Sequence, residues 1–164
     1  MTPDGVPPAV GDRAPDLSLR DTHGTPVSLD GLRGTPVALV FFPFAFSGLC
    51  TGELCELRDG IGEFEQAGVR LLGISCDPLF TLRAWAEAEG FGFDLLSDFW
   101  PHGDAARAYG VFDQATGVAA RGSFLVDADG IVRWSLVNPR GQARDIGAYR
   151  AALATLGPGE GVRR

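Results

Sequence analysis

Cys50 stands where a buried strand is expected to pass into a helix. The residues before it, 37–42, form a continuous apolar run that predicts a strand covered on both faces. Apolar residues spaced three and four apart predict a helix after it. Ligands usually bind at this carboxyl end of a strand in a parallel strand–helix–strand unit. The free amides and the dipole of the first helical turn favour the thiolate, which is the nucleophilic form of cysteine. The position of Cys50 therefore predicts a nucleophilic thiol.

Two residues of the loop before Cys50 can support this chemistry. Ser47 lies three residues earlier and can donate a hydrogen bond to the sulfur or to a bound oxygen, and Pro43 can shield the thiolate from water. The alternative is purely structural, because free cysteine is commonly a small buried apolar residue. The residue pattern alone leaves both interpretations of Cys50 open.

The hydrophobic pattern also predicts the elements that must position Cys50. These are, in order, a hairpin of residues 17–19 and 27–29, a strand at 37–42, a helix from Cys50 that Gly68 ends, a strand at 69–75, a helix at 79–89, a short strand at 94–96, a helix at 104–109, a hairpin of 123–126 and 131–134, and a helix at 146–156. This order is typical of an α/β fold of the thioredoxin type, with a central mixed sheet and helices on both faces. We expect a single domain over residues 1–164, with flexible ends at 1–9 and 158–164.

The charge balance limits the classes of partner. All fourteen basic residues are arginine, against twenty-one acidic residues, which gives a net charge of −7 and an isoelectric point near 4.7. We expect no nucleic-acid partner and no anionic membrane partner, because phosphate binding needs clustered positive charge. The apolar centre of the longest uncharged run, 34–52, is too short to cross a bilayer. The absence of lysine excludes a Schiff-base mechanism.

The sequence carries no strong signal for a cofactor, a metal or secretion. His23 and His102 are isolated, and Gly90-x-Gly92 lacks the third glycine of a dinucleotide-binding loop. We therefore expect neither a cofactor nor a metal. Three cysteines are too few for a disulfide scaffold, and residues 1–10 contain no basic residue of the kind that begins a signal peptide. These features predict a reducing, cytoplasmic location.

The spacing Pro43-x-x-x-Ser47-x-x-Cys50 resembles the active-site pattern of the peroxiredoxins, Pro-x-x-x-Thr/Ser-x-x-Cys. Segments 97–103 and 108–112 are similar to the alkyl hydroperoxide reductase E type of this family. Residues 14–17 resemble its opening segment, and 121–124 resemble the segment that carries an essential arginine. The resemblance implies a thiol-dependent peroxidase on a thioredoxin-like fold, and a homodimer.

The resemblance also implies a role for each matching residue. Cys50 would attack the terminal oxygen of hydrogen peroxide or an organic hydroperoxide and become a sulfenic acid. Arg121 would stabilise the thiolate and polarise the peroxide. Ser47 and the backbone amides of Leu49 and Cys50 would hold the peroxide oxygens; serine keeps the hydroxyl of the commoner threonine and loses its methyl group. Glu53 resembles the acidic residue that bonds Arg121 in the family, and is otherwise a favourable carboxylate in the first helical turn.

The two types of peroxiredoxin that the sequence resembles differ in the thiol that resolves the sulfenic acid. Cys55 has the spacing of the resolving cysteine in Q-type (bacterioferritin-comigratory) peroxiredoxins, which implies a Cys50–Cys55 disulfide. Five residues of helix place the two Cα atoms about 8–9 Å apart, so the first turns must unwind before that bond forms. The E-type resemblance instead implies a one-cysteine mechanism with Cys55 as a bystander and an external reductant, such as thioredoxin or mycoredoxin with mycothiol. Cys76 is either a buried thiol or an alternative partner.

Two other functions fit the same fold. A dithiol–disulfide oxidoreductase is disfavoured because the chain has no Cys-x-x-Cys. A non-enzymatic binding or chaperone module would not depend on Cys50. The sequence leaves open the preferred peroxide, the reductant, the resolving thiol and the oligomeric state.

Overall fold

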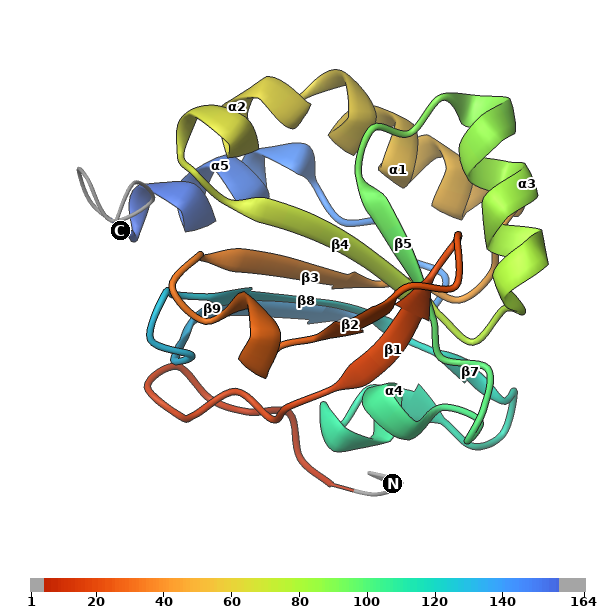
Figure 1. Cartoon of the computed structure of the whole chain (residues 1–164), viewed down its shortest axis with the longest axis horizontal. Coiled ribbons are helices and arrows are strands. Elements are labelled where there is room, and N and C mark those ends of the chain that lie inside the picture. The colour runs from red at the N-terminus through yellow and green to blue at the C-terminus, as the bar shows by residue number, and fades with distance from the viewer. Residues whose placement is uncertain (1–4, 157–164) are drawn as a thin grey trace.

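The computed structural model, which describes residues 5–156, is built around a seven-stranded mixed sheet (Figure 1). The strand order is β2-β1-β5-β4-β3-β8-β9. These strands are β1 (Ser18–Asp21), β2 (Pro26–Ser28), β3 (Val37–Phe41), β4 (Arg70–Ser75), β5 (Asp94–Ser97), β8 (Arg121–Val126) and β9 (Val132–Asn138). Strands β3, β4 and β5 are mutually parallel, and the other neighbouring pairs are antiparallel. The predicted α/β class with a mixed sheet is confirmed.

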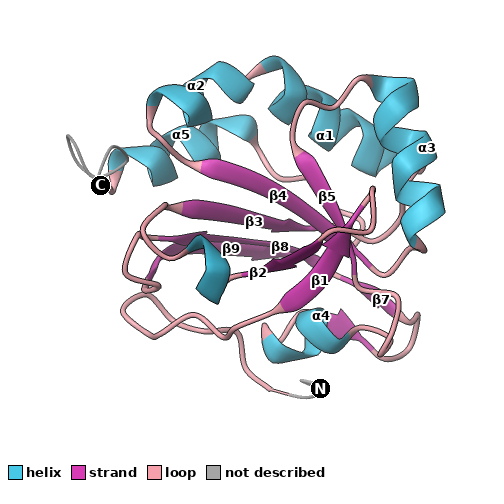
Figure 2. Cartoon of the chain, viewed as in Figure 1, coloured by secondary structure: helices cyan, strands magenta, loops and turns pink. Residues whose placement is uncertain are grey.

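Helices cover both faces of the sheet, as Figure 2 shows. They are α1 (Gly48–Asp59), α2 (Ile61–Gln66), α3 (Leu79–Glu89), α4 (Asp104–Ala108) and α5 (Ile146–Ala154), with a short 3-10 turn at Asp30–Leu32. Helices α1, α2, α3 and α5 bury apolar residues in one core cluster, and α4 buries its alanines in the cluster on the opposite face. The sheet therefore separates two apolar layers.

Strand β3 shows how the sequence builds both layers. Val37, Leu39 and Phe41 belong to the cluster on the α4 side, while Ala38 and Val40 belong to the cluster under α1. Successive side chains of a strand point to opposite faces, so a strand covered on both sides must be apolar at every position. This is the reason for the unbroken apolar run before the loop that leads to Cys50.

The sheet register fixes the edge at which the site lies. Val40 of β3 pairs with Ser123 of the antiparallel strand β8. The start of β8 at Arg121 therefore lies beside the carboxyl end of β3, where the chain passes through Pro43 into α1. The topology brings two distant segments of the chain to the same edge.

The long helix predicted from Cys50 to Gly68 is two helices. The helix breaks at Gly60, whose backbone (φ −96°, ψ 13°) leaves the helical region and whose N–H bonds Glu56 O and Arg58 O. The apolar stripe continues across the break, since Leu54, Leu57 and Phe64 are all buried. Hydrophobic periodicity therefore predicted the buried face correctly and missed the break.

Other elements differ in smaller ways. A two-stranded ribbon of β6 (Phe112–Asp113) and β7 (Val118–Ala119) was not predicted, because strands of two residues carry no periodicity. Strand β9 continues to Asn138, four residues beyond the predicted end. The expected flexible ends fall largely on 1–4 and 158–164, which lie outside the described residues, and their flexibility stays a prediction. Within residues 5–156, no helix is long and apolar enough to cross a membrane.

Candidate active site

Cys50 is the third residue of α1 and has no solvent-exposed surface. Its Sγ accepts a hydrogen bond from Nη1 of Arg121, at 3.3 Å. The contact spans 71 positions of the chain, and it exists because β8 begins beside the end of β3. The sequence pattern placed Cys50 at a helix start, and the fold adds a cation in direct contact with its sulfur.

Ser47 caps the helix that carries Cys50. Its Oγ accepts a hydrogen bond from the backbone N–H of Cys50, at 3.4 Å, and donates one to Phe44 O, at 3.1 Å. A serine in this position satisfies an amide that the helix leaves free. The hydroxyl thus bonds the backbone of Cys50 in this state, rather than the sulfur that the sequence suggested as its partner.

Glu53 joins two arginines beneath Cys50. Its carboxylate is 4% exposed and pairs with Nη1 of Arg121 and with Nη2 of Arg144, the latter at 3.0 Å. The backbone N–H and Nε of Arg144 bond its other oxygen. Burial by itself raises the pKa of Glu53, but the hydrogen bonds from Arg144 and the charges of Arg144 and Arg121 outweigh burial and leave the pKa below its ordinary value. Glu53 is therefore an anion.

Arg144 is a site residue that the sequence did not indicate. Its side chain is 1% exposed, and Nη1 donates to Phe41 O, Gly122 O and Ser123 Oγ, at 2.7, 3.0 and 3.0 Å. It lies in a polar loop between β9 and α5 with no motif around it, and arginine in such a loop is ordinarily exposed to solvent. Only the tertiary fold, which turns this loop under β3 and β8, shows its role.

The buried charges around Cys50 are net positive. Arg121 and Arg144 carry two positive charges, and Glu53 carries one negative charge. Buried charges are costly unless they are paired, so a second negative charge in contact with Arg121 is favourable here. The sulfur of Cys50 occupies this position, so the arrangement suits a nucleophilic sulfur held beside a hydrogen-bond donor.

The loop over Cys50 combines a buried proline with exposed aromatic residues. Pro43 is buried, while Phe44 and Phe46 are 41% and 55% exposed. Phe46 has a φ of 69°, which is rare for a bulky residue, and its ring lies 6.2 Å from that of Trp85. Such strained backbone concentrates at functional sites. Because Cys50 has no exposed surface, its sulfur becomes accessible only after a local movement of the structure.

Cys55 faces away from this cluster. It is half-buried, and its Sγ donates to Oε1 of Glu89, at 3.4 Å. Burial raises the pKa of the Cys55 thiol, and the hydrogen bond to Glu89 raises it further. The two cysteines of α1 therefore occupy different environments, with a cation at Cys50 and a carboxylate at Cys55.

Cys76 lies on the other side of the sheet from Cys50. It is buried in the cluster on the α4 side, whereas Cys50 belongs to the cluster under α1. Burial, together with the charges of Asp98 and Asp77, raises the pKa of Cys76 to about 12. The sequence placed Cys50 and Cys76 at the same edge of the sheet. Their backbones do lie there, but their thiols lie on opposite faces of the sheet.

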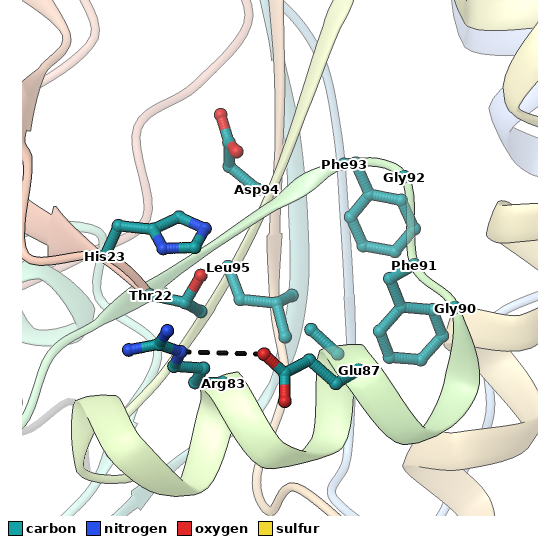
Figure 3. Close-up of a pocket in the computed structure, with 11 residues that line it drawn as sticks. Thr22, His23, Arg83, Glu87, Gly90, Phe91, Gly92, Phe93, Asp94 and Leu95 are labelled. Carbon is teal, nitrogen blue, oxygen red and sulfur yellow. Dashed lines mark ion pairs between the residues drawn. The ribbon is translucent and has the colours of Figure 1, made fainter.

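Two cavities on the described surface are lined by residues other than these thiols. One, of about 300 Å³, lies between α3 and the start of β5, where Arg83 and Glu87 pair and His23 approaches from the β1–β2 turn (Figure 3). Another, of about 450 Å³, is lined by Phe80, Phe99 and Trp100 among others. Within residues 5–156, no group of three or more His, Cys, Asp and Glu side chains is placed to hold a metal ion.

Comparison with known proteins agrees with this geometry. Residues 10–135 match the AhpC/TSA family. The chain is 49% identical over 148 residues to alkyl hydroperoxide reductase E of Mycobacterium bovis and Mycobacterium tuberculosis, covering 90% of this chain and 97% of the relative. It is 33% identical over 147 residues to a peroxiredoxin of Thermoplasma volcanium, covering 86% of this chain and 71% of that protein.

Solved structures give the same result. Peroxidoxin BcpB from Mycobacterium tuberculosis superposes with a TM-score of 0.80 at 35% identity, covering 91% of this chain and 96% of that one. AhpC of Enterococcus faecalis superposes with a TM-score of 0.82 at 26% identity, covering 89% and 90%. The thioredoxin-like fold predicted from the sequence is confirmed. The chain belongs to the AhpC/TSA family of peroxiredoxins.

Proposed function

We propose that Cys50 is the residue through which this thiol-dependent peroxidase reduces hydrogen peroxide and organic hydroperoxides. The thiolate attacks the terminal oxygen of the hydroperoxide, an S–O bond forms and the O–O bond breaks. The leaving oxygen takes a proton and departs as water or an alcohol, and Cys50 becomes a sulfenic acid. The observation that carries the proposal is the buried contact between Cys50 Sγ and Arg121 Nη1.

The surrounding residues have separate tasks in this step. Arg121 stabilises the thiolate and polarises the peroxide, and Glu53 holds Arg121 in place through a buried ion pair. Ser47 Oγ and the amide of Cys50 are hydrogen-bonded to each other, and a peroxide oxygen that binds here replaces this bond with a bond to each group. Pro43 keeps water from the sulfur.

Turnover tests the assignment. Peroxide consumption is measured with dithiothreitol as the reductant, on the wild type, Cys50→Ser and the control Cys76→Ser. We expect Cys50→Ser to abolish turnover and Cys76→Ser to retain it, because Cys76 lies on the opposite face of the sheet. Unchanged turnover in Cys50→Ser would contradict the proposal.

The sulfenic acid is resolved either by Cys55, through an intramolecular disulfide, or by an external thiol. The Cys55 route is supported by its place in the same helix, and Gly52, with open space around it, eases the unwinding that the route requires. The external route is supported by the bond that holds Cys55 to Glu89. Steady-state turnover of Cys55→Ser with thioredoxin, and with mycoredoxin plus mycothiol, separates the two. Loss of thioredoxin-dependent turnover alone favours Cys55.

We propose a homodimer and a cytoplasmic location as the setting of this reaction. Phe80, Phe99 and Trp100 are 76%, 48% and 81% exposed and line one apolar cavity, a pattern typical of protein interfaces. A second copy of the chain is the expected occupant. Sedimentation of wild type and Trp100→Glu tests this, since a wild-type monomer at micromolar concentration would contradict the dimer. The unpaired cysteines support a reducing compartment.

A further inference from the structure

Cys55 is hydrogen-bonded to the last residue of α3. Its Sγ donates to Oε1 of Glu89, at 3.4 Å, and three residues later Arg58 donates from Nη1 to the backbone oxygen of Glu89, at 2.6 Å. Glu89 is the last residue of α3, because Gly90 adopts a left-handed conformation (φ 69°) and ends the helix there. Two bonds from α1 therefore meet at one residue whose position the fold fixes.

These bonds oppose the geometry of the Cys50–Cys55 disulfide. Cys50 is fully buried against Arg121 on the sheet side of α1, while Cys55 is half-buried against α3. The disulfide needs the first turns of α1 to unwind and also needs Cys55 to leave Glu89. Glu89 therefore adds a barrier to the one that helix geometry already imposes.

Glu89 also affects the reactivity of the Cys55 thiol. Burial raises the pKa of Cys55, the hydrogen bond to Glu89 raises it further, and the charges of Glu89 and Asp59 act in the same direction. The charge of Arg58 lowers it. These groups, from α1 and α3, are the charged groups that face the thiol. A protonated thiol is a poor nucleophile, so the environment slows attack by Cys55.

Helix stability does not account for an acidic residue at this position. The carboxyl end of a helix carries the negative end of its dipole, where a carboxylate is unfavourable. The ion pair between Arg58 and Glu89 is long, at 3.9 Å, and both side chains are about one-third exposed. Such a pair contributes only about 0–1 kcal/mol. The hydrogen bond to Cys55 is the interaction of Glu89 that affects the reactivity of a thiol.

We propose that Glu89 is a positioning residue that delays the Cys50–Cys55 disulfide by holding Cys55 as a thiol against α3. The inference rests on the proposed function of Cys50. In the delayed step, the Cys55 sulfur loses its proton to solvent and attacks the sulfur of the Cys50 sulfenic acid. An S–S bond forms, the S–O bond breaks, and the hydroxide leaves as water with a proton from solvent. The Cys50 sulfur is reduced and the Cys55 sulfur is oxidised, and during the delay an external thiol can react instead.

The test compares Glu89→Gln with the matched control Glu87→Gln. Glu87 lies on the same helix, bears the same charge and pairs with Arg83 at 3.6 Å (Figure 3). Reduced protein receives one equivalent of hydrogen peroxide, is quenched with acid and an alkylating agent at successive times, and is analysed by mass spectrometry for the Cys50–Cys55 peptide. Circular dichroism verifies that each variant folds.

We expect disulfide formation to be about three-fold faster in Glu89→Gln. Loss of the Glu89 charge lowers the pKa of Cys55 and gives more thiolate, and the accompanying loss of nucleophilicity offsets part of that gain. Glu87→Gln should match the wild type. In a Cys50→Ser background, alkylation of Cys55 by iodoacetamide should reach its midpoint at a lower pH in Glu89→Gln than in Glu87→Gln. A residue that only supported the helix would leave that pH profile unchanged.

Three results would overturn the inference. The first is a disulfide rate and an alkylation profile in Glu89→Gln equal to those of the wild type. The second is sulfenic acid on Cys50 in Glu89→Gln without any disulfide to Cys55. The third is an absence of oxidation at Cys50 in every variant. In that case the Cys50 sulfenic acid never forms, so the proposed function itself would be overturned.

Discussion

At the scale of single residues, the site is one buried electrostatic cluster. It consists of Cys50, Arg121, Glu53 and Arg144. Glu53 bonds both arginines, Arg121 contacts the sulfur, and Arg144 bonds backbone oxygens of β3 and β8. Removing one charge from such a buried set leaves the others without compensation. We therefore expect the same residues to contribute to both stability and reactivity.

Glu53→Gln tests this coupling. We expect it to lower the free energy of unfolding by about 3 kcal/mol, because two buried guanidinium groups lose their counter-ion. We also expect at least a ten-fold slower reaction of the protein with peroxide, since Arg121 loses the partner that fixes it. Urea denaturation and stopped-flow mixing with peroxide measure the two effects.

The matched control is Glu63→Gln, which removes the same charge from an exposed pair with Arg150. It should change stability by less than about 0.5 kcal/mol. Equal destabilisation of the two variants would contradict the account of the buried cluster.

The elements of the site depend on how α1 begins. Ser47 ends the loop and caps the helix with its hydroxyl, which places the amide of Cys50 and the sulfur at the first turn. The strained backbone of Phe46 immediately precedes this cap. The loop and the helix start therefore act together as the frame of the site.

Two substitutions of Ser47 separate the cap from the side-chain volume. Ser47→Ala should cost about 1 kcal/mol of stability, since the amide of Cys50 loses its acceptor, and should slow peroxide reduction. Ser47→Thr keeps the hydroxyl and should retain both properties. Thermal denaturation and the rate with hydrogen peroxide measure the outcome, and a Thr variant as impaired as Ala would show that the hydroxyl is not the determinant.

Local signals explain what was predictable from the sequence. The strand before Pro43 and the helix that carries Cys50 follow from the hydrophobic pattern, which acts within a few residues. The break at Gly60 was missed because the apolar stripe runs through it. Arg144 was missed because its partners lie on β3, β8 and α1, up to 103 positions away in the chain. Periodicity contains no information on such long-range contacts.

At the scale of the whole molecule, the described residues 5–156 include two buried carboxylates with opposite pH behaviour, Glu53 and Asp98. The pKa of Glu53 is lowered, so its stabilising contribution is present above its ordinary pKa and is lost as the pH falls. Burial raises the pKa of Asp98 to about 6, although the N–H groups of Ala105 and Ala106 bond the carboxylate and oppose the shift. Its native state binds the proton more tightly than the unfolded state, so its contribution is greatest at low pH and is lost as the pH rises through 6.

Asp98→Asn isolates this contribution, because the variant does not titrate. Relative to it, the wild type should lose about 2 kcal/mol of stability as the pH rises from 4 to 7, which is most of the effect of a pKa shift from 3.8 to about 6. Urea denaturation at successive pH values gives the difference. A difference independent of pH would show that the native pKa of Asp98 is ordinary.

The account of the whole molecule depends on which sulfur meets the peroxide first. The direct measurement treats reduced Cys55→Ser with one equivalent of hydrogen peroxide in the presence of dimedone, which traps sulfenic acids, and maps the adduct by mass spectrometry. The account predicts one adduct on Cys50 and an unmodified Cys76. An adduct or higher oxidation on Cys76, with Cys50 recovered as the free thiol, would contradict it.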